Sequence, residues 1–227
     1  MSKTIVYVIL VSLTILAIWA IIIVGLDLSH LKIGHFENAD KINSILINLS
    51  YSFIAGLIFY ILVTQMPYMI EKKRNDPVIA SLVNNISKQV NISIETYENK
   101  GISNVIESIS EDELSTLITS KSIFDPSFIG QQIMANNNTT NLFIIKQTVE
   151  IIREEIKAIL EFKKYLSTEQ QIILNKIRMC DYFNFTKNTQ DTPLERALFN
   201  TPEVRLRVGT SLYELILFTR ELIATTK

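Results

Sequence analysis

Histidine and cysteine are the residues most often used for nucleophilic catalysis and zinc binding, and this chain of 227 residues has few of them. Its two histidines are His30 and His35, and its only cysteine is Cys180, which stands among apolar and aromatic residues with no base at hand. Two ligands in one short loop could share a metal only weakly, and an unactivated thiol is a poor nucleophile. We therefore expect neither a Ser–His or Cys–His pair nor a zinc site in residues 71–227.

Other chemistry is equally unsupported by residue spacing. Glu111, Asp112 and Glu113 could bind a cation, but they follow Ser110 in the pattern of a helix start, where acidic side chains stabilise the helix dipole. The glycines after residue 100 are solitary, so no phosphate-binding loop is expected. Lys and Arg number 22 against 23 Asp and Glu, which leaves no basic field for nucleic acid. We expect no enzyme, no cofactor, no metal and no nucleic-acid partner.

Two uncharged stretches are long enough to cross a lipid bilayer. Residues 5–26 would extend about 33 Å as a helix, which matches the hydrocarbon core. A cleaved signal peptide is the alternative, but only Lys3 precedes this stretch and its apolar core continues through bulky residues 21–24. The second stretch, residues 45–68, is followed by a cluster of charged side chains, Glu71, Lys72, Lys73 and Arg74.

Basic residues beside a span favour the cytoplasmic side of the membrane. The sequence thus predicts a transmembrane hairpin in residues 1–70, with residues 27–44 as an outside loop, both termini in the cytoplasm and a cytoplasmic domain in residues 71–227. Lys72, Lys73 and Arg74 would meet anionic lipid headgroups and anchor the chain at the membrane surface.

The second span carries a stripe of small and polar residues. They recur every four residues and drift slowly around one helical face: Asn48, Ser52, Gly56, Tyr60 and Thr64. Small residues allow close helix packing in lipid, and an amide in lipid needs a partner. Two interpretations stay open: the stripe packs against the first span, or it faces other copies in a homo-oligomer, where it could line a pore.

The remaining two-thirds of the chain is predicted to be a helical bundle, so the fold class is all-α. Helix-start signals, including four residue pairs in which Asp or Thr precedes Pro, divide it into segments near 77–98, 111–121, 126–136, 141–166, 168–184, 193–199 and 202–225. Residues 92–96 alternate and could instead form a short strand, and residues 136–140 form a polar linker.

Apolar periodicity supports this division and places the last helix at the centre. One stripe runs through the first of these helices: Ile79, Leu82, Val83, Ile86, Val90, Ile94 and Tyr97. In the last helix, apolar residues cover a broad arc, which suits a buried position: Leu206, Tyr213, Leu215, Ile216, Leu217 and Leu222. Gly209 within it suggests close packing with a neighbour.

The second span and its flank also resemble known proteins. The pattern consists of Ser50-Tyr51, the run Phe59-Tyr60-Ile61-Leu62-Val63, Pro67 and Lys72-Lys73-Arg74. It resembles the corresponding part of a group of bacterial membrane proteins that have a two-span hairpin and a helical cytoplasmic domain. Some of that group resemble two-span effectors of anti-phage systems such as certain retrons. The resemblance implies a multi-pass protein of the bacterial inner membrane that is held silent and harms the membrane upon infection.

Two hypotheses of function follow. In the first, the chain is a non-enzymatic membrane effector in anti-phage defence, whose hairpins self-associate under control of the cytoplasmic bundle. In the second, it is a membrane-anchored adaptor or sensor whose helices bind a protein partner that carries the activity.

Overall fold

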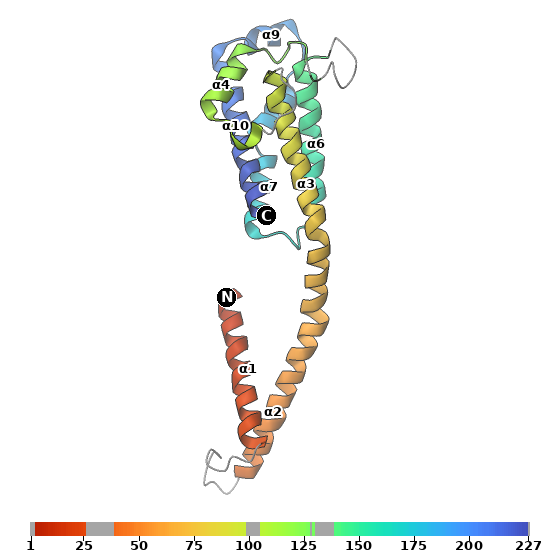
Figure 1. Ribbon diagram of the computed structural model, residues 1–227, viewed down its shortest axis with the longest axis vertical. Helices are drawn as coiled ribbons and strands as arrows, with labels where there is room; N and C mark the ends of the chain where they lie inside the picture. The colour runs from red at the N-terminus through yellow and green to blue at the C-terminus, as the bar shows by residue number, and fades with distance from the viewer. Residues whose placement is uncertain (1–2, 26–38, 99–104, 128, 130–138, 227) are drawn as a thin grey trace. The chain divides into compact units, whose positions relative to one another are not determined.

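The computed structural model describes residues 3–25, 39–98, 105–127, 129 and 139–226, and these residues are helical with short connections and no strand. An isolated bridge pairs Pro126 with Thr140. The chain divides into two compact units, residues 1–72 and residues 73–227. The prediction of an all-α fold is therefore confirmed for the part of the chain that the structure describes (Figure 1).

The first unit is built on two helices, α1 (Lys3–Gly25) and α2 (Ala39–Tyr60), which lie side by side and run in opposite directions (Figure 1). Ala17, Ala20 and Ile23 of α1 are buried, as are Asn43 and Ser50 of α2. About half of the other described side chains of this unit are large, apolar and exposed. The second helix begins at Ala39, six residues before the predicted span; His30 and His35 lie outside the described residues.

A π-helical turn, Ile61–Gln65, joins α2 to α3 (Met66–Glu98) without a break in the helix. In it the Met66 amide donates to the Ile61 carbonyl, five residues back. Pro67 follows directly, and in a regular helix its ring would meet the carbonyl of Val63. We attribute the wider turn to this proline, because an extra residue in the turn relieves that clash.

The helix start predicted at Asp76-Pro77 is wrong, because Pro77 lies inside α3. The proline removes one backbone hydrogen bond, but the helix continues through it and its apolar stripe is buried from Ile79 onwards. The alternative strand at residues 92–96 is also wrong: this segment belongs to α3 and is buried on nearly all sides.

The second unit is a helical bundle, as predicted. Besides α3 and the 3₁₀ turn Val105–Glu107 it contains α4 (Glu111–Ser120), α6 (Asn141–Glu161), α7 (Thr168–Arg178), α8 (Asp181–Asn188), α9 (Pro193–Phe199) and α10 (Pro202–Thr226). One apolar core joins these helices, and its fully buried side chains include Ile86, Ile94, Leu114, Ile152, Ile156, Leu174, Tyr182, Leu212 and Leu215.

Local capping sets most of the helix starts. Capping boxes form at two of the predicted helix starts, near 111 and 168: Ser110 accepts from the Glu113 amide at 3.3 Å, and Ser167 accepts from the Gln170 amide at 3.1 Å. Thr192 caps α9, with Pro193 as its first residue. Each cap satisfies amides that have no partner within the helix, which is why these starts could be read from the sequence.

Two predicted helices differ from the structure. The segment 168–184 is two helices, α7 and α8, separated at Met179 and Cys180. Pro126 does not begin a helix; it forms the bridge to Thr140, and the Asp125 carboxylate accepts from the Ser122 amide at 2.8 Å instead of capping forwards. Most of the predicted helix 126–136 and of the linker 136–140 lies outside the described residues, and Thr140 caps α6.

The last helix, α10, has the central position predicted for it, because it packs against α4, α7, α8 and α9. Its buried side faces the core through Val208, Leu212, Leu215, Ile216 and Leu222. Leu206 and Leu217, however, were expected to be buried and are exposed by 56% and 38%. The helix is therefore central in the bundle and yet leaves one apolar side uncovered.

Replacing Gly209 with alanine should stabilise the bundle. A Cβ atom at Gly209 would lie 3.6 Å from Cδ1 of Ile118 and 3.9 Å from Cα of Ser115, which are ordinary contacts. Alanine favours a helix interior over glycine by about 1 kcal/mol, so we expect the free energy of unfolding to rise by about that amount. Chemical denaturation followed by circular dichroism measures it. A less stable alanine variant would mean that α4 packs more closely here than these distances imply.

Candidate functional site: the exposed face of the apolar hairpin

The side of α2 that contacts α1 is defined by burial. Asn43 and Ser50 are buried, and the half-buried residues recur at helical spacing between and beyond them: Leu46, Ile47, Phe53, Ile54 and Leu57. At about 100° per residue, this side lies nearly opposite Asn48, Ser52 and Gly56. These three residues are exposed. The small and polar stripe therefore faces away from α1, and the hairpin is packed through other residues.

Gly56 is open on its outer side. A Cβ atom placed there would have no heavy atom within 4 Å. Packing within one chain consequently gives no reason for glycine at this position. In lipid, a glycine on an outward face lets another helix approach closely, which is the use of small residues at membrane helix contacts.

Beyond Gly56 the stripe enters the π-helical turn. Tyr60 and Thr64 are both exposed, and the Gln65 side-chain amide donates a hydrogen bond to the Tyr60 hydroxyl. The amide and the phenol thus satisfy each other, which lowers the free-energy cost of placing Gln65 in an apolar environment. The wider turn also changes the helical phase, so Thr64 does not continue the straight row of Asn48, Ser52 and Gly56.

The contact between α1 and α2 depends on residues that sequence analysis did not identify. Ala17 and Ala20 of α1 are small and buried, whereas their neighbours Leu16, Ile18 and Trp19 are large and exposed. The sequence does contain a signal for this contact: two small residues stand three positions apart among bulky ones, and small residues allow a second helix to approach. Apolar composition conceals it, since every face of α1 is hydrophobic.

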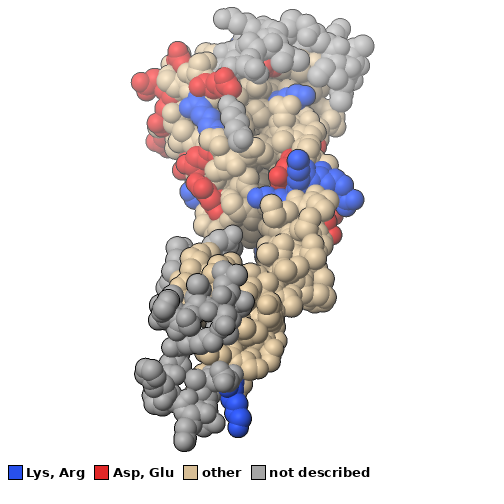
Figure 2. Space-filling model, turned by 60° about the horizontal axis from the view of Figure 1, so that its bottom comes forward, with Lys and Arg blue, Asp and Glu red and all other residues tan. Residues whose placement is uncertain are grey.

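The predicted basic anchor follows the apolar stretch in α3. Lys72, Lys73 and Arg74 are exposed, and Glu71 before them is half-buried. Within the residues searched, one helix is long and apolar enough to cross a membrane; it extends from Lys41 to Tyr97 and contains α2, the π-helical turn and α3. A shorter apolar stretch, Leu10–Ile23, belongs to α1. This composition is compatible with membrane association. Figure 2 shows the described surface of the first unit as almost uncharged and that of the second unit as charged with both signs.

Cys180 is a core residue of the bundle. It is buried between α7 and α8, and its thiol lies 3.3 Å from the Ser211 carbonyl, to which it donates. Burial raises the pKa of the thiol to about 11. A thiol with such a pKa is almost entirely protonated near neutral pH and is a poor nucleophile.

The acidic run at the start of α4 is also explained by local structure. The Glu113 carboxylate accepts from the Ser110 amide at 2.9 Å, which lowers the pKa of Glu113. In the part of the chain that the structure describes, no three His, Cys, Asp or Glu side chains are placed to hold a metal ion.

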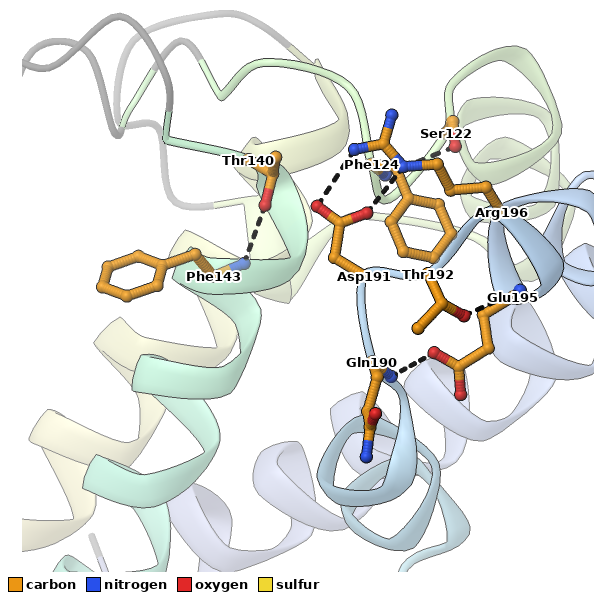
Figure 3. Close-up of polar contacts among 9 residues, drawn as sticks. All are labelled: Ser122, Phe124, Thr140, Phe143, Gln190, Asp191, Thr192, Glu195 and Arg196. Atoms are coloured by element: carbon orange, nitrogen blue, oxygen red, sulfur yellow. Dashed lines mark hydrogen bonds and ion pairs between the residues drawn. The ribbon is translucent and has the colours of Figure 1, made fainter.

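Several polar contacts hold the connection between α8 and α9 (Figure 3). Asp191 receives two hydrogen bonds from the Arg196 guanidinium, at 2.6 and 3.1 Å, and this guanidinium also lies 5.6 Å from the centre of the Phe124 ring. Glu195 accepts from the Gln190 amide, while its own amide donates to Thr192. All these hydrogen bonds join neighbouring residues of the same turn, so they fix the entry into α9.

Comparison with family models, with curated proteins and with solved structures finds no match. The functional interpretation therefore depends on the chain's own geometry.

Proposed function

We propose that the chain is an integral membrane protein of the bacterial inner membrane, in which α1 and the apolar part of the helix from Lys41 cross the bilayer as a hairpin. Both termini and the bundle would lie in the cytoplasm. The exposed apolar surface of the first unit supports this proposal, since none of the residues that the structure describes covers it. The exposed Lys72, Lys73 and Arg74 would sit at the cytoplasmic headgroups.

We further propose that copies of the hairpin associate through the stripe and that this clustering perturbs the membrane, without any catalytic step. The observation that carries it is the outward position of Asn48, Ser52 and Gly56, opposite the side that contacts α1. In lipid, the Asn48 amide on this face would be stabilised by a hydrogen bond to a second helix, and a second Asn48 offers both a donor and an acceptor. The resemblance to retron-type effectors supplies the biological setting, which is defence against phage.

Leucine at Gly56 should weaken this association. The larger side chain would keep a second helix from approaching, so we expect a lower oligomer mass in mild detergent and reduced growth inhibition when the chain is overproduced. The matched control is Ile58→Leu, because Ile58 is exposed on the same helix and the change preserves volume. Unchanged oligomer mass and unchanged toxicity in the Gly56 variant would remove the proposed interface.

A membrane-anchored adaptor is the second candidate. Its motivating observation is the uncovered apolar side of α10, which offers the bundle a surface for a protein partner. An adaptor uses the hairpin only for localisation, so the same Gly56→Leu variant would keep its biological function while the chain stays in the membrane.

A further inference from the structure

We propose that the outer side of α10 binds a basic amphipathic helix of a partner protein. This inference names the partner surface of the bundle in the proposed function, but it depends only on residues of the second unit. Its apolar part, here called the α10 strip, consists of Leu206, Tyr213 and Leu217. Tyr213 and Leu217 follow Leu206 by 7 and 11 positions, so each lies within about 20° of Leu206 around the helix axis.

The α10 strip is a solvent-facing surface and not a loosely packed part of the core. Leu206 and Leu217 are 56% and 38% exposed, and Tyr213 is half-buried against the core. The core-facing residues of α10 are separate from it, since Leu212 and Leu215 are fully buried. From Leu206 to Leu217 the strip is about 16 Å long, which is about three helical turns. A partner helix with apolar residues at matching spacing would cover it along its whole length.

Acidic residues of α10 border the strip on one side. The row consists of the exposed residues Glu203, Glu214 and Glu221. The second and third follow Glu203 by 11 and 18 positions, so all three lie in one row, about 60° around the helix axis from the strip. Two basic side chains lie on this side: Arg207, and Lys176 of α7, which pairs with Glu221 at 3.8 Å. The row therefore keeps a surplus of negative charge.

The first turn of α4 lies along the other side. The two helices run in opposite directions, because Arg205 donates to the Thr119 carbonyl at 2.5 Å, whereas Arg220 donates to the Ile109 carbonyl at 2.7 Å. This register brings the exposed Glu111 and Asp112 to the level of Tyr213, on the side where Arg205 and Arg220 also lie, so this side carries charges of both signs. Figure 2 shows acidic atoms with basic atoms among them on the flank of the bundle where α4 and α10 lie.

An apolar strip with a row of glutamates along one side selects a complementary partner. A helix with leucine-like residues on one face and Lys or Arg beside them would bury the strip and pair with the glutamate row. An anionic lipid surface would be repelled by the same carboxylates, and a second copy of this surface would bring like charges together. Charge thus favours a basic helix of a different protein.

The test uses the full chain in zwitterionic lipid nanodiscs and a fluorescent probe peptide of about 18 residues, with leucines at i, i+3, i+4 and i+7 and lysines elsewhere. Binding is measured by anisotropy after subtraction of empty nanodiscs. We expect Leu217→Gln and Glu214→Gln each to weaken binding by about tenfold. The matched controls are Leu194→Gln on α9 and Glu154→Gln on α6, both exposed and outside the strip, which should bind as the unmodified chain does. A peptide with glutamate in place of lysine should not bind.

Equal binding by strip and control variants would overturn the proposal. So would a strip variant that lowers the oligomer mass of the chain without weakening peptide binding, because the strip would then be covered by a second copy. Neither result concerns the hairpin: failure of the membrane proposal appears as unchanged oligomerisation in the Gly56 variant, whereas failure here appears in the strip variants, as unweakened peptide binding.

Discussion

Aspartate in place of Ile15 is expected to keep α1 from inserting into the membrane in most molecules. Ile15 lies near the middle of α1, points outwards and is 62% exposed, so in the proposed arrangement its side chain is surrounded by lipid. An aspartate at the centre of a spanning helix costs about 3 kcal/mol, which corresponds to about a hundredfold smaller inserted fraction. Protease accessibility of an N-terminal tag in spheroplasts measures this fraction, because the helix from Lys41 would hold the chain in the membrane even when α1 is not inserted.

The control for this experiment is Ile15→Phe, which keeps the position apolar and should insert normally. The result also separates lipid exposure from exposure to water. On a water-facing helix, aspartate at an outward position would leave the chain folded and would increase its solubility. A soluble, well-folded Ile15→Asp chain would therefore contradict a membrane-spanning α1.

Alanine at Leu212 is expected to destabilise the helical bundle by about 3 kcal/mol. Leu212 is fully buried on the central helix, and its replacement removes apolar contacts and leaves a cavity among α4, α10 and their neighbours. Denaturant unfolding of the detergent-solubilised chain, followed by circular dichroism, gives the change in the free energy of unfolding.

Leu194→Ala is the matched control for the Leu212 variant. Leu194 is a leucine of the same bundle but is 72% exposed, so its truncation should change the free energy of unfolding by less than about 0.5 kcal/mol. A similar loss in both variants would show that α10 is not the centre of the core.

Oligomerisation through the hairpin and partner binding through the bundle would use different units of the chain. The stripe of α2 belongs to the first unit, and the α10 strip belongs to the second. A partner could therefore occupy the bundle while the hairpins are still apart. This separation makes it possible to impair either activity by a single exposed substitution without touching a core residue.

Local sequence determined the helices themselves. Capping boxes at Ser110 and Ser167, the Thr192-Pro193 start and the buried stripe of α3 could be predicted because each depends on residues within one or two turns. The same local reasoning failed at Pro77 and Pro126, where a residue pattern typical of a helix start occurs inside a helix and beside a bridge. A start signal permits a helix to begin but does not stop a preceding helix from continuing.

Tertiary structure alone decided which helical faces are covered. The sequence could identify the stripe of Asn48, Ser52 and Gly56, but only the position of α1, held by Ala17 and Ala20, shows that this stripe points away from the hairpin contact. Likewise the broad apolar arc of α10 did not reveal that Leu206 and Leu217 stay exposed. The physical reason is that periodicity records how apolar residues are arranged around one helix, whereas burial depends on where the neighbouring helices lie, and that is set by contacts between residues far apart in the chain.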